Sequence, residues 1–128
     1  MSEETPVYGV QPKSFQVKLP WPPSINRYYR HWKNRMLISA AGRKYRDTVI
    51  SLCLPKPDTI TGPLYVKLEA YPPDNRRRDI DNIMKAVWDS LQHAGVYLDD
   101  SQITHMEAFK FAPVPNGGFV VVTIKEIL

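Results

Sequence analysis

Apolar and polar side chains alternate along several short segments of the chain, and such alternation is typical of half-buried β-strands. It is clearest over residues 64–71, where Leu, Val, Leu and Ala take one face and Tyr, Lys, Glu and Tyr take the other. Residues 15–19 alternate in the same way, and prolines then end that strand. Residues 102–111 and 119–127 complete the predicted strands, with residues 113–118 as a hairpin loop between them.

Two other segments have the 3.6-residue periodicity of amphipathic helices. The first is predicted to run for about 15 residues from an N-cap at Ser39 to a stop at Pro55. In the second, apolar residues recur at helical spacing from Ile80 to Leu91, and Gly95 is placed as the residue that ends it. The predicted order is β-α-β-α-β-β, an α/β single domain with a mixed β-sheet and two main helices.

The remaining segments and the overall composition limit the class of protein. Residues 24–38 have neither period and are predicted to form a loop, while residues 1–14 form an N-terminal arm before a domain over residues 15–128. The single cysteine, Cys53, cannot form an internal disulfide, and the acidic start is unlike a secretory signal. Since no apolar run approaches about 20 residues, we expect a cytoplasmic protein without a membrane partner.

Charge is unevenly distributed along the chain. The net charge of +4 is a mild excess, with 17 Lys and Arg against 13 Asp and Glu. Residues 25–56 nevertheless carry eight basic side chains and one acid, whereas residues 86–128 carry five acids and two lysines. The basic segment therefore favours an anionic partner.

Within that basic segment, cations alternate with aromatic rings over residues 26–35. This pattern suits a nucleic-acid backbone with exposed bases at a branch or an end. The alternative is a solvated loop in which Tyr28 or Tyr29 packs on the sheet. The candidate DNA contacts here are Asn26, Arg27, Tyr28, Tyr29, Arg30, Lys33 and Arg35.

Acidic side chains occur at two places outside the basic segment. Asp79 and Asp81 flank the start of the second predicted helix, and Asp99 and Asp100 precede the third strand. An N-cap and a solvated turn would explain them simply. If they instead converge, their mutual repulsion raises their pKa, and a hard divalent cation such as Mg²⁺ removes that penalty. Such a cation activates water against a phosphodiester.

Cations stand beside the first acidic pair. Lys85 follows Asp81 by four residues and so shares its helix face, where it either contacts a scissile phosphate or forms a weak surface salt bridge. Arg76, Arg77 and Arg78 either clamp phosphate or neutralise the aspartates.

Several motifs in this order resemble the RusA-type Holliday junction resolvases. The resemblance covers about residues 15–127. Its motifs are Leu19–Ser24, Asn26–Arg30, Arg76–Asn82 with Lys85, Gly95–Gln102 and Gly117–Gly118.

The resemblance implies a homodimeric endonuclease that binds four-way DNA junctions and resolves them by paired symmetric nicks in recombination and repair. The family's metal-binding aspartates correspond to Asp79, Asp81 and Asp100, and its active-site lysine to Lys85. The implied cofactor is Mg²⁺, with Mn²⁺ as a substitute. Because successive residues entering a strand point to opposite faces, Asp99 is not expected to ligate with Asp100.

We interpret the chain as a RusA-like resolvase of a bacterial or phage-infected cytoplasm, in which Arg76, Arg77, Arg78 and Asn82 add to the DNA-binding surface. One alternative is a nuclease that prefers flaps or other branched DNA. Another is a non-catalytic junction-binding or packaging factor. A pure binder gains nothing from acids that face DNA, so we favour the enzyme.

Overall fold

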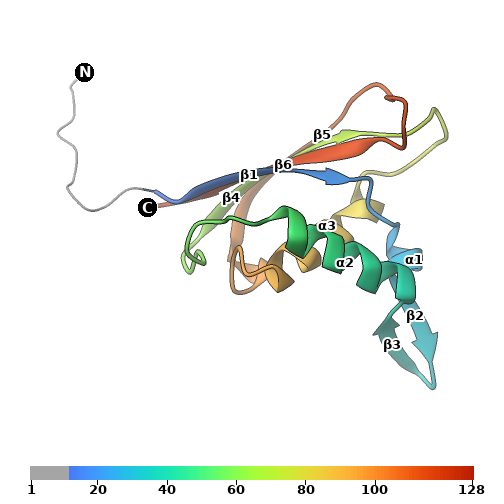
Figure 1. The fold of residues 1–128 in the computed structure, drawn as a ribbon, viewed down its shortest axis with the longest axis horizontal. Coiled ribbons are helices and arrows are strands. Elements are labelled where there is room, and N and C mark those ends of the chain that lie inside the picture. The colour runs from blue at the N-terminus through green and yellow to red at the C-terminus, as the bar shows by residue number, and fades with distance from the viewer. Residues whose placement is uncertain (1–11) are drawn as a thin grey trace.

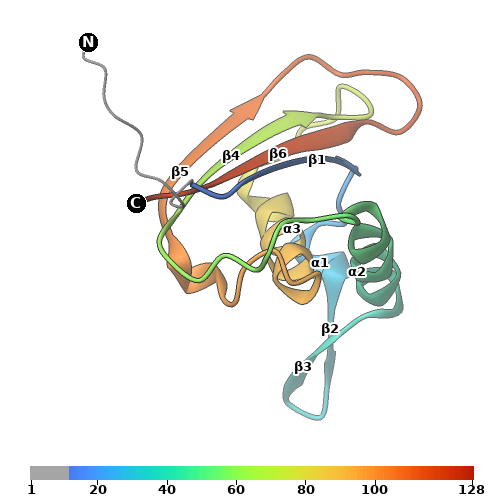
Figure 2. The ribbon, with the colours of Figure 1, turned by 60° about the vertical axis from the view of Figure 1, so that its left-hand side comes forward.

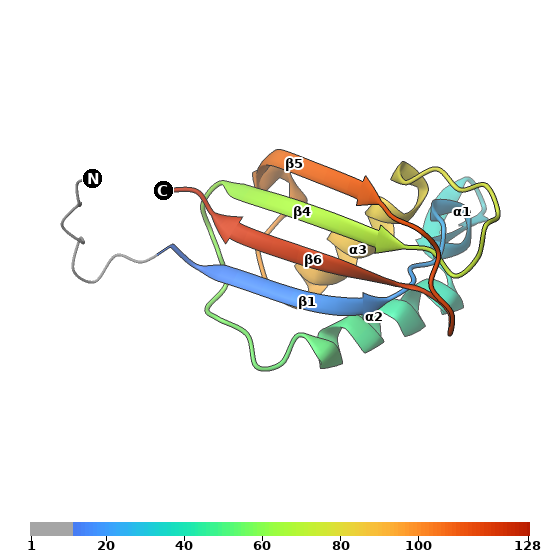
Figure 3. The same ribbon diagram turned by 90° about the horizontal axis from the view of Figure 1, so that it is seen from above.

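A four-stranded mixed sheet forms one layer of the molecule in the computed structural model, which describes residues 12–128. Its strands lie in the order β1 (Ser14–Pro20), β6 (Phe119–Glu126), β4 (Leu64–Tyr71) and β5 (Ile103–Lys110) (Figure 3). Only β4 and β5 are parallel, and the other pairs are antiparallel. The predicted α/β domain with a mixed sheet is confirmed; of the predicted N-terminal arm, residues 1–11 lie outside the described residues.

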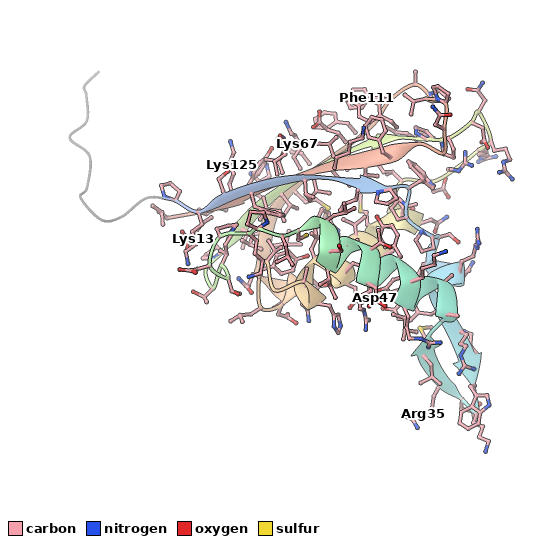
Figure 4. All side chains as sticks on the ribbon, viewed as in Figure 1. Lys13, Arg35, Asp47, Lys67, Phe111 and Lys125 are labelled. Carbon is pink, nitrogen blue, oxygen red and sulfur yellow. The ribbon has the colours of Figure 1, made fainter. Side chains whose placement is uncertain are left out.

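Two long helices, α2 (Ala40–Leu52) and α3 (Asp81–His93), cover one face of this sheet (Figure 1). The alternation in β4 is the reason, because every second residue from Leu64 to Ala70 is fully buried against the helices. The two main helices are therefore confirmed. The opposite face of the sheet carries residues such as Lys67 and Lys125 (Figure 4).

The predicted hairpin between the last two strands is wrong. Residues 113–118 do connect β5 to β6, but β4 lies between these two strands in the sheet. Each strand therefore pairs with a strand distant in the sequence. Such pairing depends on long-range contacts, which the local pattern of a loop rich in Pro and Gly does not encode.

The prediction of a loop over residues 24–38 is also wrong, because this segment has regular secondary structure. It contains a short helix, α1 (Ile25–Tyr28), and an antiparallel hairpin of β2 (Tyr29–Trp32) and β3 (Arg35–Ile38). The hairpin extends away from the sheet and helices (Figure 2). Its turn residues, Lys33 and Asn34, both have positive φ, as a two-residue type I′ turn requires.

The base of this hairpin is fixed to α2. Ser39 caps α2 by accepting a hydrogen bond from the backbone N–H of Gly42 at 2.9 Å, and its own N–H donates to the carbonyl of Tyr28 at 2.8 Å. Gly42 lies so close that an added Cβ would collide with that same carbonyl oxygen and with Ile38. The close approach sets the direction in which the hairpin leaves the domain.

Candidate active site

The carboxylates at the start of α3 are free of a capping role. The N-cap position is Ile80, which makes no side-chain cap, so neither Asp79 nor Asp81 is the predicted N-cap. Both side chains are exposed. Backbone hydrogen bonds from Asn82 and Ile83 back to residues 79 and 80 begin the helix instead. Two acids are thus displayed at the positive end of the α3 dipole, and within residues 12–128 neither carboxylate has a hydrogen bond or an ion pair.

The two aspartates of the second acidic pair, Asp99 and Asp100, make different contacts. Asp99 caps a short 3₁₀ turn, η1 (Asp100–Gln102), by accepting a hydrogen bond from the N–H of Ser101 at 2.9 Å. Hydrogen bonds from the side chain and the backbone N–H of Ser101 lower the pKa of Asp99. Asp100 instead points toward α3, where its Oδ2 lies 3.6 Å from Nζ of Lys85. Its backbone N–H donates to Gln92, which holds the turn against the same helix.

The contact between Lys85 and Asp100 joins the two acidic segments. Because Lys85 lies one helical turn after Asp81, Asp100 borders the helix face that carries Asp81. Among the described residues Lys85 therefore pairs with Asp100 and not with Asp81.

The carboxylates of Asp79, Asp81 and Asp100 do not form a complete metal-binding site in this structure. Within residues 12–128, no three His, Cys, Asp or Glu side chains lie close enough together to hold a metal ion as they stand. Carboxylate oxygens are the donors that Mg²⁺ prefers, so the donor chemistry of Asp79, Asp81 and Asp100 fits a hard divalent cation. Their role as metal ligands stays a prediction.

The arginine-rich loop before α3 opens onto a hollow of about 450 Å³ lined in part by Trp21, Asp79 and Asn82. Asp74 binds Arg78 at 2.6 Å and Arg76 at 3.2 Å, and these two guanidinium groups hold the pKa of its carboxyl well below the usual range. The two arginines therefore neutralise Asp74, which the sequence analysis did not single out.

Arg77 differs from its two neighbours. It is exposed, lines the same hollow as Asp79, and has no ion pair in the part of the chain that the structure describes. A free guanidinium beside exposed carboxylates can bind a phosphate that the carboxylates alone would repel.

Comparison with known proteins identifies the family. The sequence model described as "Endodeoxyribonuclease RusA" matches residues 20–125. The chain is 43% identical over 116 residues to proteins named crossover junction endodeoxyribonuclease RusA from Shigella sonnei (strain Ss046) and Enterobacteria phage 82. The protein of that name from Escherichia coli (strain K12) is 42% identical, and each alignment covers 89% of this chain and 96% of its relative. The chain belongs to the RusA family.

One predicted DNA contact of this RusA-family chain is wrong. The Tyr28 side chain is completely buried, and its hydroxyl donates a hydrogen bond to Asp89. The alternative was a solvated loop with Tyr28 or Tyr29 packed on the sheet. The burial of Tyr28 is observed, but the segment forms a hairpin and the Tyr28 hydroxyl binds α3. The other residues assigned to this segment remain accessible: Asn26, Arg27, Arg30, Lys33 and Arg35 are exposed, and Tyr29 is half-buried.

The partner of Tyr28 belongs to a buried polar network that sequence reasoning missed. Asp89 of α3 also accepts a hydrogen bond from Arg46 of α2 at 2.7 Å, and both side chains are largely buried. Burial alone would raise the pKa of Asp89, but the hydrogen bonds from Tyr28 and Arg46 outweigh it and lower the pKa. The only signal in the sequence was a single acidic residue within an apolar helix. A single residue of this kind does not show whether its side chain is buried or solvated.

This network places the β2–β3 hairpin next to the carboxylates. Tyr29 begins β2, directly after buried Tyr28, and the two rings meet edge to face at 5.0 Å. Burial raises the pKa of Tyr29. Tyr28 binds Asp89, which lies one helical turn after Lys85 on α3. The base of the hairpin and the acidic site therefore adjoin one another.

Proposed function

We propose that the protein is a Mg²⁺-dependent endonuclease that resolves four-way DNA junctions by paired nicks, with Mn²⁺ as a substitute cation. The observation that carries the proposal is the contact of Lys85 with Asp100, which joins two acidic segments. Arg77, which has no ion pair within residues 12–128, lines the same hollow as Asp79. Its relatives named crossover junction endodeoxyribonuclease, 42–43% identical over most of the chain, support the same activity.

In this proposal Asp79, Asp81 and Asp100 hold the cation. When bound, the cation supplies Lewis-acid stabilisation of the charge that develops on the phosphate and lowers the pKa of water. Lys85 exchanges its contact with Asp100 for a non-bridging phosphate oxygen, and Arg77 binds a neighbouring phosphate. These cations offset the repulsion between the DNA backbone and the acidic site.

We propose further that two copies act together. One chain contains one such acidic site, whereas a four-way junction has two equivalent scissile bonds related by a twofold axis. The mass in solution should then be twice the 14.7 kDa of one chain.

None of the helices within residues 12–128 has the length and apolar character that a membrane span requires.

The direct test is cleavage of a synthetic four-way junction labelled in turn on each strand, with Mg²⁺, with Mn²⁺ or with a chelator. We expect two nicks at symmetrically related positions that require the divalent ion. Linear duplexes with the same arm sequences serve as the matched control and should stay uncut. Preferred cutting of a flap would favour the other nuclease, and binding without cutting would favour the non-catalytic factor.

The basic hairpin gives a second prediction. Replacing both Arg30 and Lys33 by Ala should weaken junction binding. It should also reduce the slope of log affinity against log salt concentration by roughly 2, because each lost phosphate contact reduces that slope by about 0.9. Replacing Lys67 and Lys125 by Ala removes the same charge from the opposite face of the sheet (Figure 4). If both double variants change the slope equally, the hairpin is not the DNA surface.

A further inference from the structure

The tip of the β2–β3 hairpin displays a large aromatic side chain that is half exposed to solvent. Trp32 is 48% exposed and Met36 is 58% exposed, although both belong to a two-stranded sheet that pairs with no other described strand. The hairpin base is different, since Tyr29 and Ile38 pack against the hydrophobic core. Figures 1 and 2 show the tip far from the main sheet.

The side chains around the ring are suited to nucleic acid. The hairpin, residues 29–38, contains three cations and no carboxylate. Nζ of Lys33 lies 4.4 Å from the centre of the Trp32 ring, and Arg35 is directly opposite Trp32 in the strand register. A flat apolar face beside fixed cations can stack on a base while the cations bind the adjoining phosphates.

The hairpin is also held firmly enough to position that ring. Its turn is the tight two-residue type, and its base is tied to α2 through Ser39 and to α3 through Tyr28 and Asp89. An isolated two-stranded hairpin is only marginally stable, so these attachments supply the order that the pairing itself lacks.

We propose that Trp32 stacks on a base pair left open at the branch point and thereby selects branched DNA over linear duplex. This inference rests on the proposed function and names how that site chooses its substrate. In a linear duplex every base is covered on both sides, so insertion of a ring must first unstack a step. At a branch the helical stack is interrupted, and a ring can cover the exposed face without that cost.

The distance between the tip and the acidic site suits this role. Tyr29 directly follows Tyr28, which binds Asp89 one helical turn after Lys85, and Trp32 lies three residues beyond Tyr29. At a rise of about 3.4 Å per residue the ring lies roughly 10 Å further out, which is about three nucleotides along a strand. A phosphate held at Lys85 would therefore leave Trp32 within a few nucleotides of the cut.

The test compares wild type with Trp32→Ala, Trp32→Phe and Trp32→Lys on an uncut junction in chelator, with 2-aminopurine at the branch point. Wild type and Trp32→Phe should change the emission there, and not at a position ten nucleotides into an arm. Trp32→Ala and Trp32→Lys should leave the emission unchanged. Their preference for junction over duplex should fall roughly tenfold. The Lys variant separates stacking from charge, because it adds a cation while removing the ring.

The control is Leu54→Ala, which removes another side chain that is 65% exposed, next to the end of α2. Unchanged melting temperatures for all variants would establish that the fold is intact. If Trp32→Ala keeps the wild-type emission change and branch preference, the inference fails even where wild type nicks junctions normally. If wild type nicks no junction in Mg²⁺ or Mn²⁺, the proposed function fails, and the emission experiment in chelator still decides the role of Trp32.

Discussion

Asp81→Asn should lower the rate of junction nicking on the order of a hundredfold or more while leaving the affinity for uncut junction intact. Asp81 is exposed at the first position of α3 and makes no structural hydrogen bond in the described residues. The amide has the shape of the carboxylate but lacks its charge, so it weakens a divalent cation site without disturbing the helix. The measurement is single-turnover nicking of a labelled junction, beside a binding titration in chelator.

Two control pairs sharpen this prediction. Asp47→Asn removes an exposed charge from α2, where Asp47 has no ion pair with any described residue, and should leave the rate unchanged (Figure 4). At the second acidic pair, Asp99→Asn should keep full activity because asparagine also caps a helix, whereas Asp100→Asn should lose it. Equal losses at Asp99 and Asp100 would contradict the division of tasks between them.

Asp89→Ala should lower the free energy of unfolding by about 2–3 kcal/mol, because it leaves the Arg46 guanidinium and the Tyr28 hydroxyl buried without their acceptor. Asp47→Ala, which removes an exposed acid, should change it by less than about 0.5 kcal/mol. Denaturant unfolding of both variants measures the difference. A small effect at Asp89 would mean that water replaces the lost carboxylate.

Two further measurements test the same network. The double variant Arg46→Met/Asp89→Ala should lose less stability than the two single variants together, since no charge is then left unpaired. The pKa of Asp89 is lowered in the folded protein, so its contribution is present above the ordinary value near 3.8 and is lost as pH falls through the lowered pKa. The stability gap between wild type and Asp89→Ala should therefore narrow in acid, and a gap that widens would contradict this.

The sequence predicted those elements whose determinants are local. Ser39 caps α2 as expected, Gly95 ends α3 with a φ of 81°, and the alternation of β4 matches its buried face. In each case the deciding atoms lie within a few residues of one another. Asp79, Asp81, Asp100 and Lys85 were singled out from spacing and from the family resemblance, and their roles stay predictions.

The missed features depend on contacts between distant residues. The turn of the β2–β3 hairpin uses Lys33 and Asn34 at positive φ without a glycine, so the usual signal for such a turn is weak. The buried Asp89 is matched by Arg46, 43 residues earlier, and by Tyr28, 61 residues earlier. Nothing near Asp89 in the sequence reveals either partner.

The position of β6 between β1 and β4 also determines when the domain can fold. During synthesis β1 is made first among the described strands, yet its only partner in the sheet, β6, is made last. The nascent chain must therefore carry β1 unpaired until residues 119–126 have left the ribosome. A chain stopped before residue 119 would expose the edges of both β1 and β4, and we expect it to aggregate or to be degraded rather than to form a smaller nuclease.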